Sequence, residues 1–185
     1  KLEEEARELL RRLEEHVRKS KKEAEDNLRR LEKHVEDSKR RLKELLDRLR
    51  KTVEDLKRAN LDKKDVKRVL DKLRRDLEKI LEELRRDNER LERHLRKSTK
   101  RLEDDNKDLR DKLEEIKDRL RRSNVEEDVV RRAADALRRV HEAHKRMVEE
   151  VKRRHDEIHK RHEKVVRDAE RALREVLKRL EEAAR

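Results

Sequence analysis

The residues of this chain best suited to carry chemistry are its eight histidines. Several of them recur with asparagine and serine at one fixed spacing. A spacing of 18 residues relates His16 to His34, Ser20 to Ser38, His141 to His159, His144 to His162 and, in the reverse direction, Asn106 to Asn88. Neutral imidazole carries one hydrogen-bond donor and one acceptor, and serine and asparagine supply both kinds of group. Such a set can satisfy its own polar atoms when it is buried.

Apolar residues recur at alternating steps of three and four along the whole chain, which predicts long amphipathic helices. The pattern of the first helix restarts every 18 residues, at positions 2, 20, 38 and 56. Eighteen residues make about five turns at 3.6 residues per turn, so the apolar stripe follows a straight helix and does not supercoil.

The stripe is interrupted twice, at Asn60-Leu61-Asp62 and at Ser123-Asn124-Val125-Glu126. Asparagine tolerates the left-handed conformation that ends helices, and aspartate is a good N-cap. We therefore predict helices over about 2–59, about 63–122 and about 126–184. Short junctions favour antiparallel neighbours. The expected fold is an all-α, single-chain, up-down-up three-helix bundle of long, nearly straight helices, forming one elongated domain over residues 1–185.

Folding the chain at these junctions predicts which polar residues share a layer. Facing residues of the first two helices should have numbers that sum to about 122, and the third helix should run parallel to the first with an offset of about 125. Three buried networks follow. The first contains His16, Asn106 and His141 in one layer and Ser20 and His144 in the next. The second repeats it with His34, Asn88 and His159, then Ser38 and His162, and a less regular third group between them contains Asn27, His94, Ser98 and His155.

Composition excludes several functions. The chain has no Gly, Pro, Cys or aromatic residue, 59% of its residues are charged, and its formal net charge is +12 with the signs interleaved. No apolar run is long enough to span a membrane and no targeting signal is visible, so we expect a soluble protein. Without aromatic residues or a purely basic cluster we expect no specific nucleic-acid partner. We also expect no enzymatic activity, no small-molecule substrate, no cofactor and a monomeric state.

In style the full chain resembles de novo designed helical bundles with buried histidine hydrogen-bond networks, because polar layers alternate with leucine layers beneath a Lys/Arg/Glu/Asp exterior. That family responds to pH, and it includes monomeric three-helix designs intended to disrupt membranes after acidification. The resemblance implies a synthetic construction and an acid-triggered function, with the endosome as the intended place of action and an anionic membrane as the partner at acidic pH.

The chemistry of buried imidazole agrees with a pH switch, because protonation turns an acceptor into a donor and places charge in the core. Burial lowers a histidine's pKa, so stability should be lost as the pH falls below about 6.5. Two alternatives stay open. The networks could serve only to specify the register of a structural scaffold, or the histidines could bind metal, since His141 and His144 are three residues apart and His155 and His159 four. We predict no designed metal site.

Overall fold

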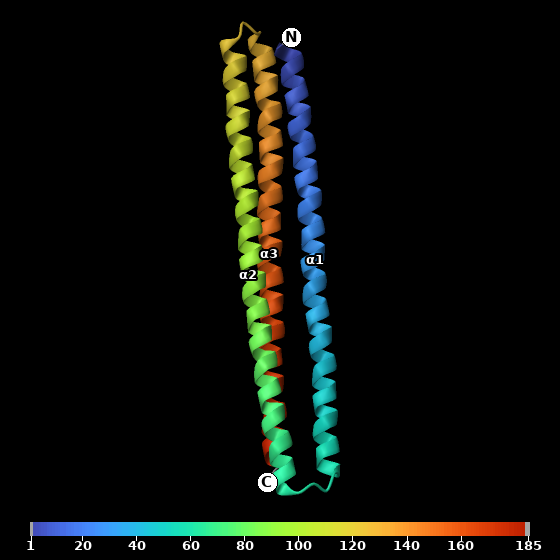
Figure 1. Ribbon diagram of the computed structural model, residues 1–185. Coiled ribbons are helices and arrows are strands. Elements are labelled where there is room, and N and C mark those ends of the chain that lie inside the picture. The colour runs from blue at the N-terminus through green and yellow to red at the C-terminus, as the bar shows by residue number, and fades with distance from the viewer. Residues whose placement is uncertain (1, 184–185) are drawn as a thin grey trace. The chain divides into compact units, whose positions relative to one another are not determined.

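The computed structural model describes residues 2–183 and contains three α-helices in this range, with no β-strand (Figure 1). They are α1 (Leu2–Arg58), α2 (Lys63–Arg122) and α3 (Glu127–Ala183). The predicted bounds were 2–59, 63–122 and 126–184, and residue 184 lies outside the described residues. Helix–helix contacts join all three helices, which confirms the all-α three-helix bundle.

Backbone hydrogen bonds explain where the helices begin and end. The carbonyl of Asp62 accepts the first bond of α2 from the N–H of Val66 at 3.0 Å, as the carbonyl of an N-cap residue does. The carbonyl of Glu126 accepts the corresponding bond of α3 from Val130 at 3.2 Å. No residue in the described range has a positive φ. Asn60 therefore does not take up the left-handed conformation that its residue type favours.

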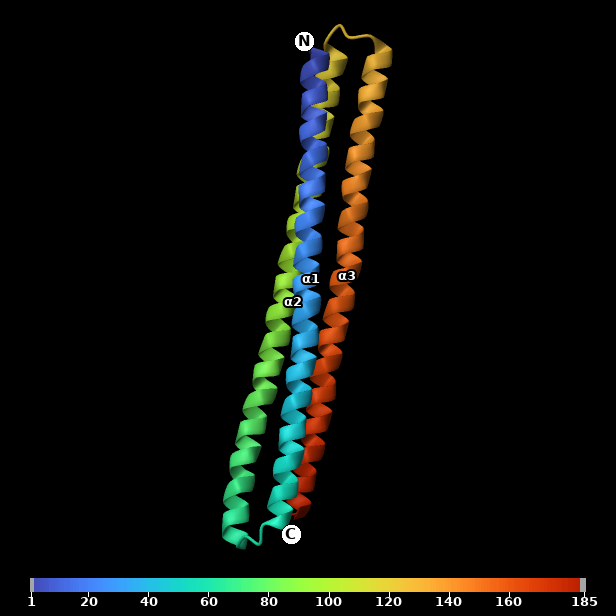
Figure 2. The same cartoon turned by 90° about the vertical axis from the view of Figure 1, so that its right-hand side faces the viewer.

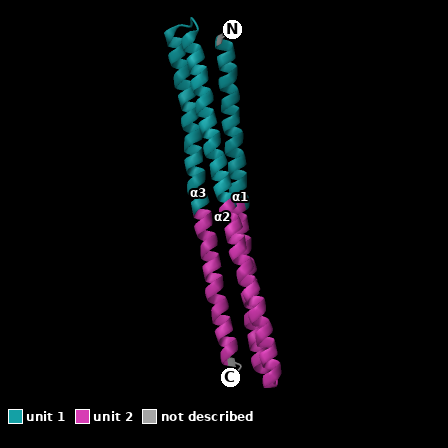
Figure 3. Cartoon of the chain, turned by 60° about the vertical axis from the view of Figure 1, so that its left-hand side comes forward, with its two compact units in different colours: residues 1–30, 94–156 teal, residues 31–93, 157–185 magenta. Residues whose placement is uncertain are grey.

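The contacts of the chain divide into two compact units, each made of one segment from every helix (Figure 3). Unit 1 comprises residues 1–30 and 94–156, and unit 2 comprises residues 31–93 and 157–185. Within unit 2, α2 runs antiparallel to α3, because Arg74 pairs with Glu181 and the later Arg85 pairs with the earlier Glu170. The colours of Figure 2 show that α2 runs in the direction opposite to α1 and α3.

Each unit has a core of leucine and valine from all three helices. In unit 1, Leu109, Leu113, Leu137 and Val140 form a buried cluster against which residues of α1 such as Leu13 pack. In unit 2 the buried cluster consists of Leu49, Val53, Leu77, Leu173, Val176 and Leu180. Burial of such side chains contributes about 1.5–3 kcal/mol each, so these clusters are the main source of stability in their units.

Of the three helices, α3 has the most buried side chains. It contributes more buried apolar side chains than α1 or α2, and the buried histidines of the described residues, His144, His155 and His162, all lie on it. The polar residues of the core therefore lie mainly on α3, and their partners lie at the edges of the other two helices.

In the described residues no helix has a stretch apolar enough to cross a membrane.

Candidate histidine networks

The first network lies in unit 1 and centres on His144, whose side chain is completely buried. The Nδ1–H of His144 donates to Oδ1 of Asn106 on α2 at 2.9 Å. Its Nε2 lies 3.3 Å from the carboxylate of Asp105 on the same helix. The Nε2 of His16 on α1 approaches that carboxylate at 3.2 Å. One aspartate thus stands between two imidazoles that come from different helices.

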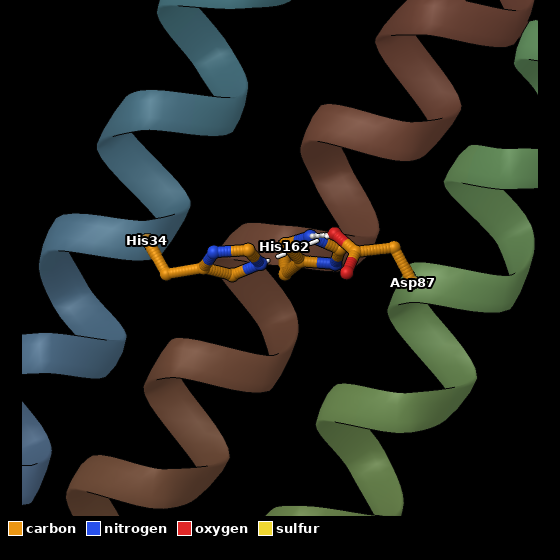
Figure 4. A group of neighbouring side chains, drawn as sticks. All are labelled: His34, Asp87 and His162. Atoms are coloured by element: carbon orange, nitrogen blue, oxygen red, sulfur yellow. Dashed lines mark hydrogen bonds and ion pairs between the residues drawn. The ribbon is translucent and has the colours of Figure 1, made fainter.

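Unit 2 contains a second network built from the same residue types. The Nδ1–H of His162 donates to Oδ1 of Asn88 at 2.8 Å, and its Nε2 lies 3.4 Å from Oδ2 of Asp87. The Nε2 of His34 lies 3.1 Å from that same oxygen. The rings of His34 and His162 stack with centroids 5.9 Å apart and planes inclined by 14°. Figure 4 shows both rings directed toward the Asp87 carboxylate, with one residue contributed by each helix.

The third buried histidine has a simpler environment. His155 is 3% exposed, and its Nδ1 is hydrogen-bonded to the hydroxyl of Thr99 on α2 at 2.8 Å. Its Nε2 is buried and has no hydrogen-bond partner among the described residues. Among the described residues no carboxylate forms an ion pair with this ring as Asp105 does with His144, so a second proton on the ring would be left without an acceptor.

The remaining predicted residues surround these networks without bonding to the buried rings. Ser20, Asn27 and Ser98 line an open cleft of about 440 Å³ in unit 1, together with His16 and His155. Water in this cleft can satisfy their polar groups. In unit 2, Ser38 on α1 is half-buried.

Two further histidines of α3 are half-buried, and the two differ in their surroundings. The Nε2 of His141 is buried without a hydrogen-bond partner among the described residues. The Nε2 of His159 lies 3.4 Å from Glu163 and 3.9 Å from Glu92. Neither ring joins the aspartate-centred networks through a hydrogen bond.

The structure corrects the expected layers in two respects. His16 and His34 lie level with His144 and His162 and not with His141 and His159, because the offset between α1 and α3 is three residues larger than the predicted value of about 125. Three residues are almost one helical turn. His144 therefore takes the place beside His16 that was expected for His141, and His162 takes the place beside His34 that was expected for His159.

The second correction concerns burial. The side chains of His16 and His34 are 52% and 45% exposed, and His94 is also exposed, although all three were predicted to be in the core. On α1 the inward positions are taken by adjacent valines, Val35 being 3% exposed. The core of a three-helix bundle is narrow, so the flanking positions of a stripe reach solvent.

Burial lowers the pKa of the three core histidines, with opposing contributions from their neighbours. The pKa of His155 is lowered by desolvation and further by the charges of His94 and Arg154, while Asp156 raises it. Desolvation also lowers the pKa of His144, but the carboxylate of Asp105 counteracts it. His162 follows the same pattern, its pKa being lowered by burial and partly restored by Asp87.

Sequence reasoning missed the two aspartates and Thr99. A signal for them was present, because Asp87-Asn88 and Asp105-Asn106 repeat the same dipeptide at the spacing of the histidines. Aspartate was assigned to the solvated exterior, as a charged residue usually is. In the structure Asp87 and Asp105 are half-buried and each faces two imidazoles.

No protein-family model, curated protein or solved structure matches this chain.

Proposed function

We propose that this chain is an acid-sensitive helical bundle whose three-helix packing is weakened when the histidines in its core become protonated. The observation that carries the proposal is the environment of His155. Its ring is 3% exposed, one nitrogen is bonded to a hydroxyl, and the other is buried without a partner. Protonation would place a charge and an unsatisfied N–H in the interior, which is strongly unfavourable.

His144 responds to acid less strongly than His155 in this proposal. A proton on its Nε2 would face the carboxylate of Asp105, 3.3 Å away, and this ion pair would offset part of the desolvation. His16 competes for the same carboxylate, and His141 adds a further positive charge nearby once it is protonated. The network around His144 is therefore a weaker second trigger.

The other charged groups around His155 come from all three helices. Arg154 and Asp156 flank it on α3, and His94 faces it from α2. Across the cleft, α1 presents Glu23 and α2 presents Arg101. Both signs are represented, so the pKa of His155 is set mainly by its burial.

The direction of the pH dependence follows from these shifts. The pKa values of His144 and His155 in the folded protein lie below the unperturbed value of 6.5. Between the lowered pKa and pH 6.5 the unfolded chain binds more protons than the folded chain, so the free energy of unfolding falls as the pH decreases. Stability is complete above about pH 6.5 and is lost as the pH passes down through the folded pKa values.

Circular dichroism of the helices between about pH 7.5 and 4.5 tests the proposal. We expect a cooperative loss of helical signal beginning below about pH 6.5, at a fixed urea concentration just below the midpoint at neutral pH. The urea makes a loss of free energy visible in a very stable bundle, and a chelator removes metal ions that could hold histidines together. A helical signal that stayed flat down to about pH 5 would contradict the proposal and favour networks that only specify register.

We further propose that the opened bundle binds anionic membranes. Separation of the helices would expose side chains such as Leu28, Leu77 and Leu173, which are 0% exposed in the folded protein. Protonation of all eight histidines would also raise the formal net charge from +12 to +20. Cationic amphipathic helices bind anionic surfaces by their apolar face.

Release of a trapped dye from anionic liposomes measures this activity. We expect release at about pH 5 that is at least ten-fold faster than at about pH 7.5, and little release from zwitterionic liposomes at either pH. Because His144, His155 and His162 lie on the face that would insert, their charges oppose deep insertion. Equal release at both pH values would contradict a link between opening and membrane binding.

We also propose a designed origin. Its support is the 18-residue repetition of five positions, occupied by histidine, serine and asparagine on three helices, together with a sequence that contains no Phe, Trp or Tyr. Design practice fills helices with Leu, Ala, Glu, Lys and Arg and places polar networks between apolar layers.

A further inference from the structure

The second network, in unit 2, has the donor set of a metal site. His34, Asp87 and His162 each offer one ligand atom, and these three atoms lie within 4.8 Å of one another (Figure 4). We propose that they bind a divalent first-row transition-metal ion of the Zn²⁺ class. This inference is independent of the acid-sensitive function, which rests on His144 and His155 in unit 1.

The distances fit tetrahedral coordination. Ligands about 2.0–2.1 Å from Zn²⁺ at the tetrahedral angle are about 3.3 Å from one another. The carboxylate Oδ2 of Asp87 lies 3.1 Å from Nε2 of His34 and 3.4 Å from Nε2 of His162. Two edges therefore already have this length, and the third, between the ligand nitrogens of His34 and His162, is no longer than 4.8 Å.

The hydrogen bond behind the site selects the required tautomer of His162. Its Nδ1–H donates to the amide oxygen of Asn88 at 2.8 Å, so the lone pair of neutral His162 lies on Nε2. That Nε2 is buried, has no hydrogen-bond partner among the described residues, and faces a carboxylate oxygen. Metal-binding histidines are commonly oriented by such a carbonyl on their second nitrogen. A cation between Nε2 and Oδ2 would satisfy both atoms.

Ligand chemistry and access support the choice of ion. Two imidazoles and one carboxylate suit Zn²⁺, Co²⁺, Ni²⁺ or Cu²⁺ better than Mg²⁺ or Ca²⁺, which prefer oxygen ligands. His162 is completely buried, whereas the side chain of His34 is 45% exposed. An ion can enter from the exposed His34 side, and water can supply the fourth ligand.

Isothermal titration of the full chain with Zn²⁺ at about pH 7.5, after removal of metal by a chelator, tests the site. We expect His34→Ala and Asp87→Asn each to weaken binding by about 100-fold or more, and Asn88→Ala by about 10-fold. The side chains of His34 and Asp87 are 45% and 36% exposed, so these variants should keep the fold, which helical circular dichroism verifies.

The matched controls are His16→Ala and Asp105→Asn, which remove the same residue types from unit 1. We expect these variants to change the affinity of the unit 2 site less than about three-fold. The ring-nitrogen resonances of His34 and His162 should shift with the first equivalent of Zn²⁺. The proposal is overturned if His34→Ala binds as tightly as the parent chain, or if the first equivalent shifts only His16 and His144.

Discussion

Replacement of both His144 and His155 by leucine should leave a bundle that keeps its helical signal at about pH 5, under urea conditions in which the parent chain unfolds. The same change should raise the free energy of unfolding at neutral pH by about 1 kcal/mol per site. Both results follow from one cause. These are buried rings with a lowered pKa, and a leucine gains the apolar burial without acquiring a charge in acid.

The balance of terms at each site gives the neutral-pH estimate. Burial of leucine contributes about 1.5–3 kcal/mol, and the hydrogen bond to Asn106 or Thr99 that is lost contributes about 1 kcal/mol. The partners are half-buried and can turn to water, which limits the penalty of leaving them unpaired. Of the two single variants, His155→Leu should remove more of the acid response, because Asp105 opposes the shift at His144.

A control uses histidines that the structure places at the surface. His16→Leu combined with His94→Leu changes the same number of imidazoles, but both rings are exposed. Urea unfolding at a series of pH values should give a steep loss of stability for this control and a nearly flat profile for His144→Leu with His155→Leu. If both double variants lost stability equally with falling pH, the acid response would come from carboxylates or from surface charge.

Truncation of Leu173 to alanine should lower the free energy of unfolding by about 2–5 kcal/mol. The side chain is 0% exposed and belongs to the core of unit 2, where it lies in one cluster with Leu77 and Val176. The loss combines the removed apolar burial with the cavity that remains, and straight helices allow only limited collapse around it. With no Phe, Trp or Tyr in the sequence, the core depends on such leucines.

Urea unfolding at neutral pH measures this loss, and Leu61→Ala is the matched control. Leu61 lies in the junction between α1 and α2 and is 43% exposed, so the same chemical change should alter stability by less than about 0.5 kcal/mol. A loss of less than about 1 kcal/mol for Leu173→Ala would mean that the helices repack readily around the missing group. The dependence of unit 2 on its buried leucines would then be wrong.

The two proposed properties use different networks of similar composition. In unit 1, His16 and His144 share Asp105, while in unit 2, His34 and His162 share Asp87 and stack on each other. The stacked pair brings its ligand atoms within 4.8 Å, which is why the metal site is assigned to unit 2. A chelator during acid titration, and neutral pH during metal titration, keep the two measurements separate.

The helical class could be derived from sequence because it depends on local rules. Apolar residues at steps of three and four need a helix to share one face, and the absence of Gly and Pro leaves little to interrupt it. The junctions at Asp62 and Glu126 were visible as breaks in this pattern, and their carbonyls start α2 and α3. The regular spacing of histidines and asparagines likewise marked both polar networks in the sequence.

Only the tertiary structure decided which rings are buried and which groups they contact. Each residue turns a helix by about 100°, so a small error in the rotation of α1 moves His16 and His34 from the core to its edge. An error of three residues in offset pairs His16 with His141 instead of His144, since both lie on the same face of α3. The contacts of Asp87 and Asp105 with the rings could not be predicted from helix periodicity or from the spacing of the histidines. Their position depends on how three helices approach one another, and that approach is set by side-chain packing across the whole core.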